Sequence, residues 1–416
     1  MSIIGRFLQS VVEKGSLQVT HPDGTSETYG APTAGYPDIS IRLADKNVVR
    51  QILLDPRLGA AETFMDGRLI VEQGDIMGLV QLLRANKPFE RGGKLKDPSA
   101  FKKFRDHVAG SLDRINFLGR SKSNVAHHYD IGNDLYDLFL DDDLQYSCAY
   151  WDFERRGPDM TLEQAQADKK AHIVAKLDLR PGQRVLDIGC GWGGMALYLH
   201  RTTGVEVVGI TLSKEQLKKA RERAEKEGVA DKVKFELIDY RDLAQRDAGA
   251  FDRIVSVGMF EHVGTPQFRT FFRSCANLMT DDGVMLLHTI GRMGGPGTTD
   301  AFTRKYIFPG GYIPALSETL EASEQFRMIA TDVENLRLHY AFTLREWYKR
   351  TVDNRDKIVA LYDERFYRMW IFYLAGATAA FENGGMCNYQ IQFSRNRRTL
   401  PITRNYIAEA EKNLTA

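Results

Sequence analysis

The most informative segment of this 416-residue chain reads Arg184-Val185-Leu186-Asp187-Ile188-Gly189-Cys190-Gly191-Trp192-Gly193-Gly194. Its first five residues include the apolar Val185, Leu186 and Ile188, which is typical of a short buried parallel strand. The glycines that follow allow a tight turn and let a ligand approach the backbone closely. A helical pattern then covers residues 195–202. The segment therefore predicts a strand, a glycine loop and a helix in direct succession.

The sequence on both sides of this segment alternates between helical and strand patterns. Helices are predicted over 161–177, 195–202 and 213–227, and strands over 184–188, 205–210, 233–238, 254–257 and 284–288. This alternation predicts an α/β fold with a doubly wound, mainly parallel sheet. A glycine-rich loop is predicted after Gly291, and helices rich in aromatic residues are predicted over about 317–381.

The N-terminal part of the chain reads differently. Residues 1–85 combine an amphipathic helix, a turn at Pro22-Asp23-Gly24, a strand over 39–43 and two apolar helices, which together predict a small α+β domain. Residues 86–122 are basic and predict a linker. We interpret its charges as a solvated run rather than as a contact with anionic lipid headgroups. Residues 123–416 would form the main domain.

Composition excludes several classes of protein. The 56 Lys and Arg nearly balance the 55 Asp and Glu, which argues against a nucleic-acid-binding protein held by bulk charge. The four cysteines show no CxxC spacing, so we expect reduced thiols and a cytoplasmic location. The longest weakly polar run, 369–381, is too short to span a membrane, and the N-terminus lacks the apolar core of a secretory signal.

The glycine loop suits either a dinucleotide or S-adenosylmethionine (SAM), and two neighbouring features favour SAM. Asp187 stands directly before the glycines, where its carboxylate could order the loop and meet the ammonium end of SAM. Thr211 and Ser213 follow the second strand, where an NAD site usually has an acid that grips the ribose. Gln216 lies one turn further on.

After the third predicted strand, Asp239 offers an acid for the adenine amino group, and Tyr240 offers a ring that could stack on the adenine. The alternative is that Asp239 is only a polar cap at the end of the strand. The candidate cofactor-binding residues are Asp187, Gly189, Gly191, Gly193, Thr211, Ser213, Gln216, Asp239 and Tyr240.

Several further segments occur in order over about 120–345. They are Ala126-His127-His128-Tyr129-Asp130-Ile131-Gly132-Asn133, Tyr146-Ser147-Cys148-Ala149-Tyr150-Trp151, Gly209-Ile210-Thr211-Leu212-Ser213, Phe260-Glu261-His262-Val263-Gly264, Leu287-His288-Thr289-Ile290-Gly291, Phe308-Pro309-Gly310-Gly311 and His339-Tyr340. With the glycine loop, they resemble the cyclopropane-fatty-acid-phospholipid synthase family. The resemblance implies a Rossmann-like, SAM-dependent methyltransferase domain behind a lipid-handling N-terminal domain.

The resemblance also implies a reaction and its residues. Such an enzyme transfers a methylene unit from SAM to the cis double bond of an unsaturated phospholipid acyl chain, through a carbon cation that loses a proton as the ring closes. A bound bicarbonate would take that proton, held by groups at Cys148, Glu261, His288, the backbone of Ile290, and Tyr340. The resemblance further implies a homodimer that visits the inner face of the membrane.

Other interpretations remain open at this point. Cys148 alone would be a buried apolar thiol, and His288 a satisfied core histidine. Tyr129, Tyr312 and Trp347 could stabilise a cation but are more simply packing residues. No HExxH motif is present, so we predict no metal site. The alternative functions are a lipid methyltransferase that leaves a methyl branch without closing a ring, an NAD-linked oxidoreductase and a non-catalytic lipid carrier.

Overall fold

The computed structural model describes residues 3–92 and 132–415, and the chain divides into two compact units. Unit 1 combines the described N-terminal residues with Thr299–Pro309 and Ala341–Met386. Unit 2 contains the remaining described residues. The predicted boundaries at residues 85 and 122 stay a prediction, because most of the linker lies outside the described residues.

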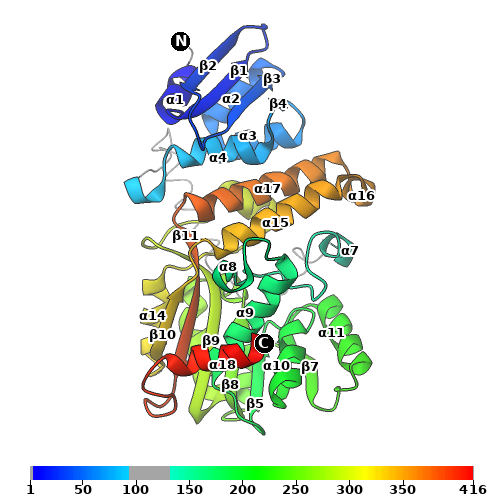
Figure 1. The fold of residues 1–416 in the computed structure, drawn as a ribbon, viewed down its shortest axis with the longest axis vertical. Coiled ribbons are helices and arrows are strands. Elements are labelled where there is room, and N and C mark those ends of the chain that lie inside the picture. The colour runs from blue at the N-terminus through cyan, green and yellow to red at the C-terminus, as the bar shows by residue number, and fades with distance from the viewer. Residues whose placement is uncertain (1–2, 93–131, 416) are drawn as a thin grey trace. The chain divides into compact units, whose positions relative to one another are not determined.

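Unit 2 is built on a seven-stranded sheet with the strand order β10-β11-β9-β8-β5-β6-β7 (Figure 1). Five strands pair in parallel, and β10 runs antiparallel to β11. The seven are β5 (Arg184–Ile188), β6 (Glu206–Thr211), β7 (Val233–Leu237), β8 (Phe251–Val257), β9 (Met279–Arg292), β10 (Ile329–Asn335) and β11 (Met386–Ser394). The predicted α/β fold with a doubly wound, mainly parallel sheet is confirmed.

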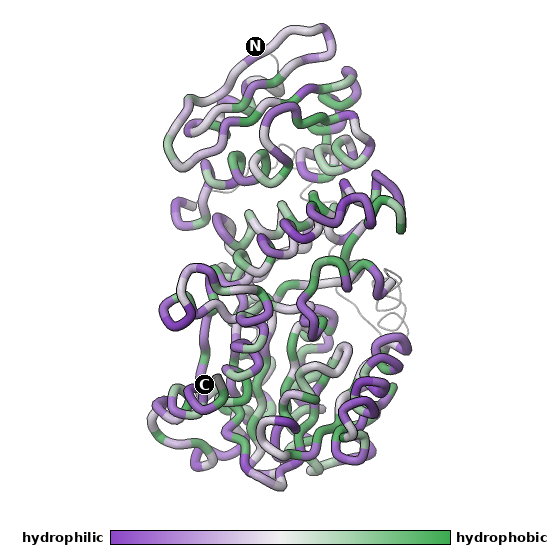
Figure 2. Tube along the Cα trace, turned by 45° about the vertical axis from the view of Figure 1, so that its right-hand side comes forward, coloured by the Kyte–Doolittle hydropathy of each residue, from purple (hydrophilic) through white to green (hydrophobic). Residues whose placement is uncertain are grey.

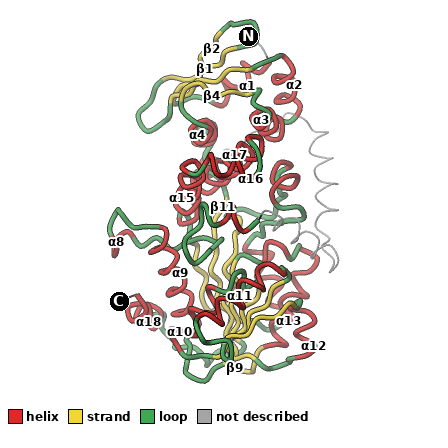
Figure 3. Tube along the Cα trace, turned by 90° about the vertical axis from the view of Figure 1, so that its right-hand side faces the viewer, coloured by secondary structure: helices red, strands yellow, loops and turns green. Residues whose placement is uncertain are grey.

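Helices cover both faces of this sheet (Figure 3). One face carries α9 (Leu162–Leu177), α10 (Gly194–Thr203), α11 (Lys214–Lys226) and α18 (Asn405–Thr415), and the other carries α12 (Tyr240–Arg246), α13 (Phe268–Leu278) and α14 (Leu316–Glu324). Val185 packs into the first layer and Leu186 into the second, because successive side chains of a strand point to opposite faces. Figure 2 shows that the strands are the hydrophobic centre of this unit.

The strand order places a ligand-binding position at the carboxyl ends of β5 and β8. From β5 the chain proceeds to β6 and β7 on one side, and β8 then pairs with the other side of β5. Such a switch point leaves a crevice between the two loops that leave the sheet in opposite directions. The loop that follows β5 is the predicted glycine loop.

The prediction that helices occupy about 317–381 is wrong in one respect. Between α14 and α15 (His339–Asp353) the chain forms strand β10, and only then do α16 (Arg355–Leu361) and α17 (Glu364–Glu382) follow. Strand β10 lies at the edge of the sheet and is mostly exposed, with Asp332 as its one buried residue. Its sequence therefore lacks the apolar alternation that identifies strands. Strand β11 was not predicted either.

Unit 1 contains a four-stranded sheet with the order β2-β1-β3-β4. Its elements are α1 (Ile3–Val11), β1 (Gly15–Thr20), β2 (Ser26–Ala31), β3 (Asp38–Leu43), α2 (Lys46–Leu54), α3 (Pro56–Met65), β4 (Leu69–Gln73) and α4 (Ile76–Ala85). The predicted α+β character is confirmed. Helix α17 packs against α3 and α4, with the rings of Phe64 and Phe372 6.0 Å apart.

Short helical turns occupy several connections: η1 (Phe89–Arg91), α7 (Asn133–Tyr136), α8 (Phe153–Arg156), η2 (Phe260–His262), η3 (Thr265–Gln267) and η4 (Thr303–Ile307). Among the described residues, no helix has both the length and the apolar composition that crossing a bilayer requires.

Candidate functional site

The glycine loop after β5 is held against β6 by backbone hydrogen bonds. The amides of Gly189 and Cys190 both donate to the carbonyl of Ile210, at 2.9 and 3.0 Å. The amide of Gly193 donates to the carbonyl of Cys190 at 2.9 Å and closes the turn before α10. The loop is therefore fixed by the protein itself.

The three predicted glycines have different surroundings. A Cβ atom on Gly189 would lie 2.8 Å from the Cβ of Met259, and one on Gly193 would lie 2.7 Å from the ring of Phe235. A Cβ on Gly191 would meet no atom of the described residues within 4 Å. Close packing thus requires two of the glycines, whereas the space beside Gly191 is open to a ligand.

Asp187 is a buried acid with an unused oxygen. Its side chain is 1% exposed, and Oδ2 has no hydrogen-bond partner among the described residues. Burial raises the pKa of Asp187 to about 7, although the positive charge of Lys169 opposes this shift. A buried carboxyl group without a partner at a switch point is suited to a cationic group of a ligand, such as the amino group of SAM.

Thr211, Ser213 and Gln216 form a compact network at the start of α11. The Thr211 hydroxyl donates to Gln216 Oε1 at 2.9 Å and accepts from the Ser213 amide at 3.1 Å. The Ser213 hydroxyl accepts from the Gln216 amide at 3.3 Å and so caps the helix. The structure brings these three predicted residues together, and their role toward a ribose stays a prediction.

Asp239 also caps a helix. Its Oδ1 accepts from the Arg241 amide at 2.9 Å, and its two oxygens accept from Arg241 Nε and Nη2 at 2.7 and 2.8 Å. Tyr240 packs edge-on against Phe271, with ring centres 5.3 Å apart. The capping alternative therefore describes what Asp239 does within the protein, and contact of either residue with adenine stays a prediction.

Three of the five predicted catalytic residues lie on the segments where β8 and β9 end. Glu261 lies in η2, just after β8, and its Oε1 accepts from the amide of Ile290 at 2.6 Å. His288 pairs in register with Val257, and its carbonyl accepts from the amide of Gly258 at 2.9 Å. The amide of Ile290, expected to face bicarbonate, thus holds Glu261 here.

Glu261 and His288 each present an unused polar atom. Burial raises the pKa of Glu261 to about 7 despite the opposing Ile290 hydrogen bond, and Glu261 Oε2 has no hydrogen-bond partner among the described residues. Burial and the charge of Lys169 hold the pKa of His288 well below its usual value, so its ring is neutral. His288 Nδ1 lies 3.2 Å from the Gln390 amide nitrogen, which donates in the assigned amide orientation, and the proton is then on Nε2. Nε2 also lacks a hydrogen-bond partner among the described residues.

The other two predicted catalytic residues lie on segments tied to each other. Cys148 is fully buried, burial raises the pKa of its thiol, and Sγ donates to the carbonyl of Ala149 at 3.3 Å. Tyr340 is 7% exposed and follows His339, whose Nδ1 accepts from the amide of Trp151 at 2.8 Å. Ser147, next to Cys148, lies 4.0 Å from the position of a Cβ on Gly258, which connects this segment to the end of β8.

Helix α9 contributes residues that the sequence analysis missed. Gln166 Nε2 donates to the carbonyls of Gln145 and Ser147 at 3.1 and 3.0 Å. Lys169 Nζ donates to Gln145 Oε1 at 2.5 Å and to Ser147 Oγ at 2.9 Å. A lysine in a polar helix usually indicates a solvated face, so the sequence offered no signal that this one is buried.

Some candidates lie elsewhere. Tyr129 and residues 126–131 of the matching segments lie outside the described residues. Tyr312 is in unit 2, where its amide donates to the Glu261 carbonyl at 2.8 Å and its hydroxyl donates to Glu318. Trp347 belongs to unit 1. Among the described residues, no group of three His, Cys, Asp or Glu side chains could hold a metal ion.

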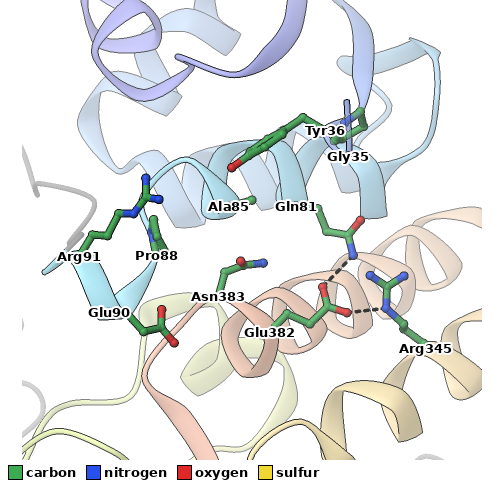
Figure 4. A pocket seen from close by; sticks show the side chains of 11 residues that line it. Gly35, Tyr36, Gln81, Ala85, Pro88, Glu90, Arg91, Arg345, Glu382 and Asn383 are labelled. Atoms are coloured by element: carbon green, nitrogen blue, oxygen red, sulfur yellow. Dashed lines mark hydrogen bonds and ion pairs between the residues drawn. The ribbon is translucent and has the colours of Figure 1, made fainter. Parts of the chain in front are cut away.

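Unit 1 has a pocket of about 490 Å³, which none of the predicted site residues lines. Figure 4 shows Glu382 at its centre, where the carboxylate accepts from Gln81 Nε2 at 3.0 Å and from Arg345 Nε. The lining residues are Gly35, Tyr36, Pro37, Gln81, Ala85, Pro88, Glu90, Arg91, Arg345, Glu382 and Asn383. Glu382 and Arg345 are paired with each other, and we do not assign the reaction to this pocket.

Comparison with known proteins places the chain among lipid-modifying enzymes. Residues 118–391 match the family model for mycolic acid cyclopropane synthetase. The chain is 38% identical to a cyclopropane-fatty-acyl-phospholipid synthase of Escherichia coli, over 88% of this chain and 90% of the relative. It is 36% identical to a probable fatty acid methyltransferase of Pseudomonas putida, over 88% and 91%. The crystal structure of mycolic acid cyclopropane synthase CmaA1 complexed with SAH and CTAB matches with a TM-score of 0.60 and 34% identity, over 66% of this chain and 98% of the other.

Proposed function

The chain belongs to the mycolic acid cyclopropane synthetase family, and on that premise we propose the reaction that it catalyses. It is an enzyme of the SAM-dependent methyltransferase fold, and its relatives are cyclopropane synthases or lipid methyltransferases. The proposed reaction transfers a methylene unit from SAM to the cis double bond of an unsaturated phospholipid acyl chain and forms a cyclopropane ring.

The proposed reaction sets three requirements for the site. SAM supplies a methyl group on a positively charged sulfur, which the double bond attacks. Because an alkene is a weak nucleophile, the site must hold it close to the methyl group and exclude water that would trap the resulting carbon cation. A proton acceptor must then remove a proton from the new methyl group as the ring closes. Glu261 and His288 are both buried, and the corner where Glu261 accepts from the Ile290 amide, near the end of β9, provides the dry surroundings.

The residues around the glycine loop would hold SAM. The unused oxygen of Asp187 would accept from its amino group, and the open space beside Gly191 would admit the ligand next to the backbone, between Gly189 and Gly193. Thr211, Ser213 and Gln216 would contact the ribose, and Asp239 and Tyr240 the adenine. Asp239 already accepts a hydrogen bond from Arg241, so its contact with adenine would be made beside that hydrogen bond.

The observation that carries the proposal is the pair of unused atoms on Glu261 and His288. Glu261 Oε2 is a buried acceptor and His288 Nε2 a buried donor, and neither has a partner among the described residues. A bicarbonate ion has a hydroxyl group that donates and oxygens that accept, so it complements both atoms. Cys148 and Tyr340 would complete its shell, and the Ile290 amide would orient Glu261. Bicarbonate, rather than Glu261, would then accept the proton.

Three further features are proposals that rest on the relatives. The name of the Escherichia coli relative includes a fatty-acyl phospholipid, which supports a phospholipid substrate. Such a substrate resides in a bilayer, so the enzyme would work at the membrane surface, on the cytoplasmic side. We also propose a homodimer, as the sequence resemblance implies.

A second reaction is favoured by one comparison. The Pseudomonas putida relative is named a probable fatty acid methyltransferase, and its identity of 36% is close to that of the cyclopropane synthase. In that reaction the cation would lose a proton from a neighbouring chain carbon to a proton acceptor, and the product would carry a methyl branch beside a double bond. The two reactions differ only in the fate of the cation.

Product analysis separates the two reactions. The protein is expressed in a host without its own cyclopropane synthase, and the extracted phospholipids are analysed by mass spectrometry and proton NMR. We expect a gain of one CH₂ with ring-proton signals in place of olefinic ones. A methyl-branched product, saturated or unsaturated, would contradict ring formation. Glu261→Gln should lower product formation by about a hundredfold or more, whereas Glu321→Gln, a change at an exposed ion pair with Arg269, should not.

A further inference from the structure

Lys169 is a buried ammonium group without an ion pair. Its side chain is 0% exposed, and its hydrogen bonds go to two neutral groups, Gln145 Oε1 at 2.5 Å and Ser147 Oγ at 2.9 Å. An ammonium group has three N–H donors. No carboxylate lies within ion-pair distance of Lys169 among the described residues, so one N–H donor remains available.

Two other buried lysines of the same helix each form an ion pair with a carboxylate. Lys170 pairs with Asp143, and Lys176 pairs with Glu334. Burying an unpaired charge costs several kcal/mol, so a buried ion is normally paired. Burial accordingly lowers the pKa of Lys169 to about 7. Lys169 differs from Lys170 and Lys176 in having no ion-pair partner in the described part of the chain.

None of the nearby acids forms an ion pair with Lys169 among the described residues. Asp141, Asp143 and Asp187 lie within electrostatic range of Lys169. Asp143 is engaged by Lys170 and Arg223, and Asp141 accepts from the amides of Gln145 and Asp143 at 2.9 and 3.1 Å. Both acids therefore hold the 141–145 turn in place.

The two acceptors of Lys169 lie at the switch point of the sheet. The side chain of Gln145 occupies the space that a Cβ on Gly194 would need, at the end of the glycine loop. Ser147 lies beside Gly258, where the chain leaves β8 toward Glu261. The charge of Lys169 acts on Asp187, Cys148 and His288, and so reaches both halves of the candidate site.

We propose that Lys169 binds a carboxylate-type anion at this switch point, between the glycine loop and the Glu261 corner. The anion would supply the missing counter-charge and accept the third N–H. The identity of the anion rests on the proposed function, which offers two ligands with this chemistry: the carboxylate of the amino-acid part of SAM, and bicarbonate. Lys169 would hold one of them through a charge-assisted hydrogen bond and would position Ser147 next to Cys148.

Binding experiments on the full chain distinguish the two ligands. The variants are Lys169→Met, Lys169→Arg and, as a matched control, Lys176→Met, which removes another buried lysine of α9. S-adenosylhomocysteine and 5′-methylthioadenosine, which lacks the amino-acid part, are titrated by calorimetry. Turnover is measured against added bicarbonate in depleted buffer. Lys169→Gln replaces Lys169→Met if the latter does not fold, as judged by circular dichroism.

If Lys169 holds the cofactor carboxylate, Lys169→Met weakens S-adenosylhomocysteine binding roughly tenfold and leaves 5′-methylthioadenosine unchanged. If it holds bicarbonate, S-adenosylhomocysteine binding is unchanged and the half-saturating bicarbonate concentration rises roughly tenfold. Lys169→Arg should restore part of either loss, and Lys176→Met should show neither. Two results would overturn the inference. One is that Lys169→Met changes neither the affinity for S-adenosylhomocysteine nor the half-saturating bicarbonate concentration. The other is an equal loss of affinity for S-adenosylhomocysteine and 5′-methylthioadenosine.

These outcomes are independent of the lipid product. A wild-type protein that binds S-adenosylhomocysteine but forms no cyclopropane lipid would contradict the proposed function and leave the calorimetric test of Lys169 intact. Conversely, cyclopropane formation with no effect of Lys169→Met on either anion would reject only the role of Lys169.

Discussion

Glu261 and His288 show how burial changes the chemistry of ordinary side chains. The Glu261 carboxyl group gains one hydrogen bond from the Ile290 amide but loses water on its other oxygen. The second effect is larger, so the pKa of Glu261 rises to about 7. His288 loses its charge for the same reason. A neutral donor and an acid with a pKa of about 7 together suit an anion that carries its own proton.

The raised pKa of Glu261 predicts a pH-dependent stability. A folded-state pKa of about 7 against an ordinary value of 4.5 means that the folded protein binds the proton more tightly than the unfolded chain. The resulting stabilisation is complete below pH 4.5 and is lost as the pH rises through 7. Relative to Glu261→Gln, wild-type stability should therefore fall by roughly 3 kcal/mol across this range.

Urea unfolding in bicarbonate-free buffer, at about pH 5 and about pH 8, measures this difference. Other titrating groups cancel because they are present in both proteins. A difference in unfolding free energy that does not change with pH would show that Glu261 keeps its ordinary pKa, and that the corner is more hydrated than the structure indicates.

Sequence reasoning succeeded unevenly at the residue scale. Glu261 was selected from one segment and His288 and Ile290 from another, and the structure joins the two segments through the Glu261–Ile290 hydrogen bond, because parallel strands bring their carboxyl ends to one edge. Lys169 was not selected, since nothing in a polar helix distinguishes a buried lysine from a solvated one. Its environment arises from the 141–148 segment folding over α9, which is a long-range contact.

At the element scale, the strand, glycine loop and helix were predicted almost to the residue because each has a local signal. The apolar residues predict β5, the glycines predict the turn, and the helical pattern predicts α10. Strand β10 has no such signal, because an exposed edge strand needs no apolar face and is specified by its pairing with β11. The roles of individual glycines in the loop also depend on tertiary neighbours.

The glycine loop allows binding to be separated from packing. Gly191→Ala places a methyl group in the open space, at a φ of +54°, and should cost only about 1 kcal/mol of stability while weakening S-adenosylhomocysteine at least about tenfold. Gly193→Ala would drive its Cβ to 2.7 Å from Phe235 and should instead lower stability by roughly 2 kcal/mol or more. Thermal melts and calorimetry measure the two effects.

Gly204→Ala is the matched control for backbone strain. Gly204 ends α10 with a φ of +72° and has no atom within 4 Å of its Cβ position, so its substitution carries the same strain without facing the loop. Gly204→Ala should have a melting temperature similar to that of Gly191→Ala and the same affinity for S-adenosylhomocysteine as the wild type. Unchanged binding by Gly191→Ala would mean that the ligand does not pass beside this glycine.

At the scale of the whole molecule, the chain passes between the two units several times. Residues Ala341–Met386 return to unit 1 after most of unit 2 has been made, and the chain then re-enters unit 2 to form β11. Sequence reasoning assigned these helices to the C-terminal domain, since adjacency along the chain was its only guide. Compact units made of distant segments have no signature in local periodicity.

This arrangement bears on the idea that the N-terminal residues act alone as a lipid carrier. Helices α3 and α4 pack against α17, where Gln81 donates to Glu382 at 3.0 Å and the Phe89 amide donates to the Asn383 carbonyl at 2.9 Å. Tyr348 of α15 donates to Asp75 at 3.0 Å. A fragment of residues 1–92 would expose the apolar surfaces of α3 and α4 that α17 covers.

We therefore expect the 1–92 fragment to melt more than about 10 °C below a variant in which a flexible linker joins 1–92 to residues 341–386. The reason is that a small domain buries little apolar surface, so the loss of one covering helix removes a large share of its free energy of unfolding. Circular dichroism melts and binding of a hydrophobic dye compare the two proteins. Equal melting temperatures and no dye binding by 1–92 would show that the N-terminal residues form an independent domain after all. The carrier hypothesis would then regain its physical basis.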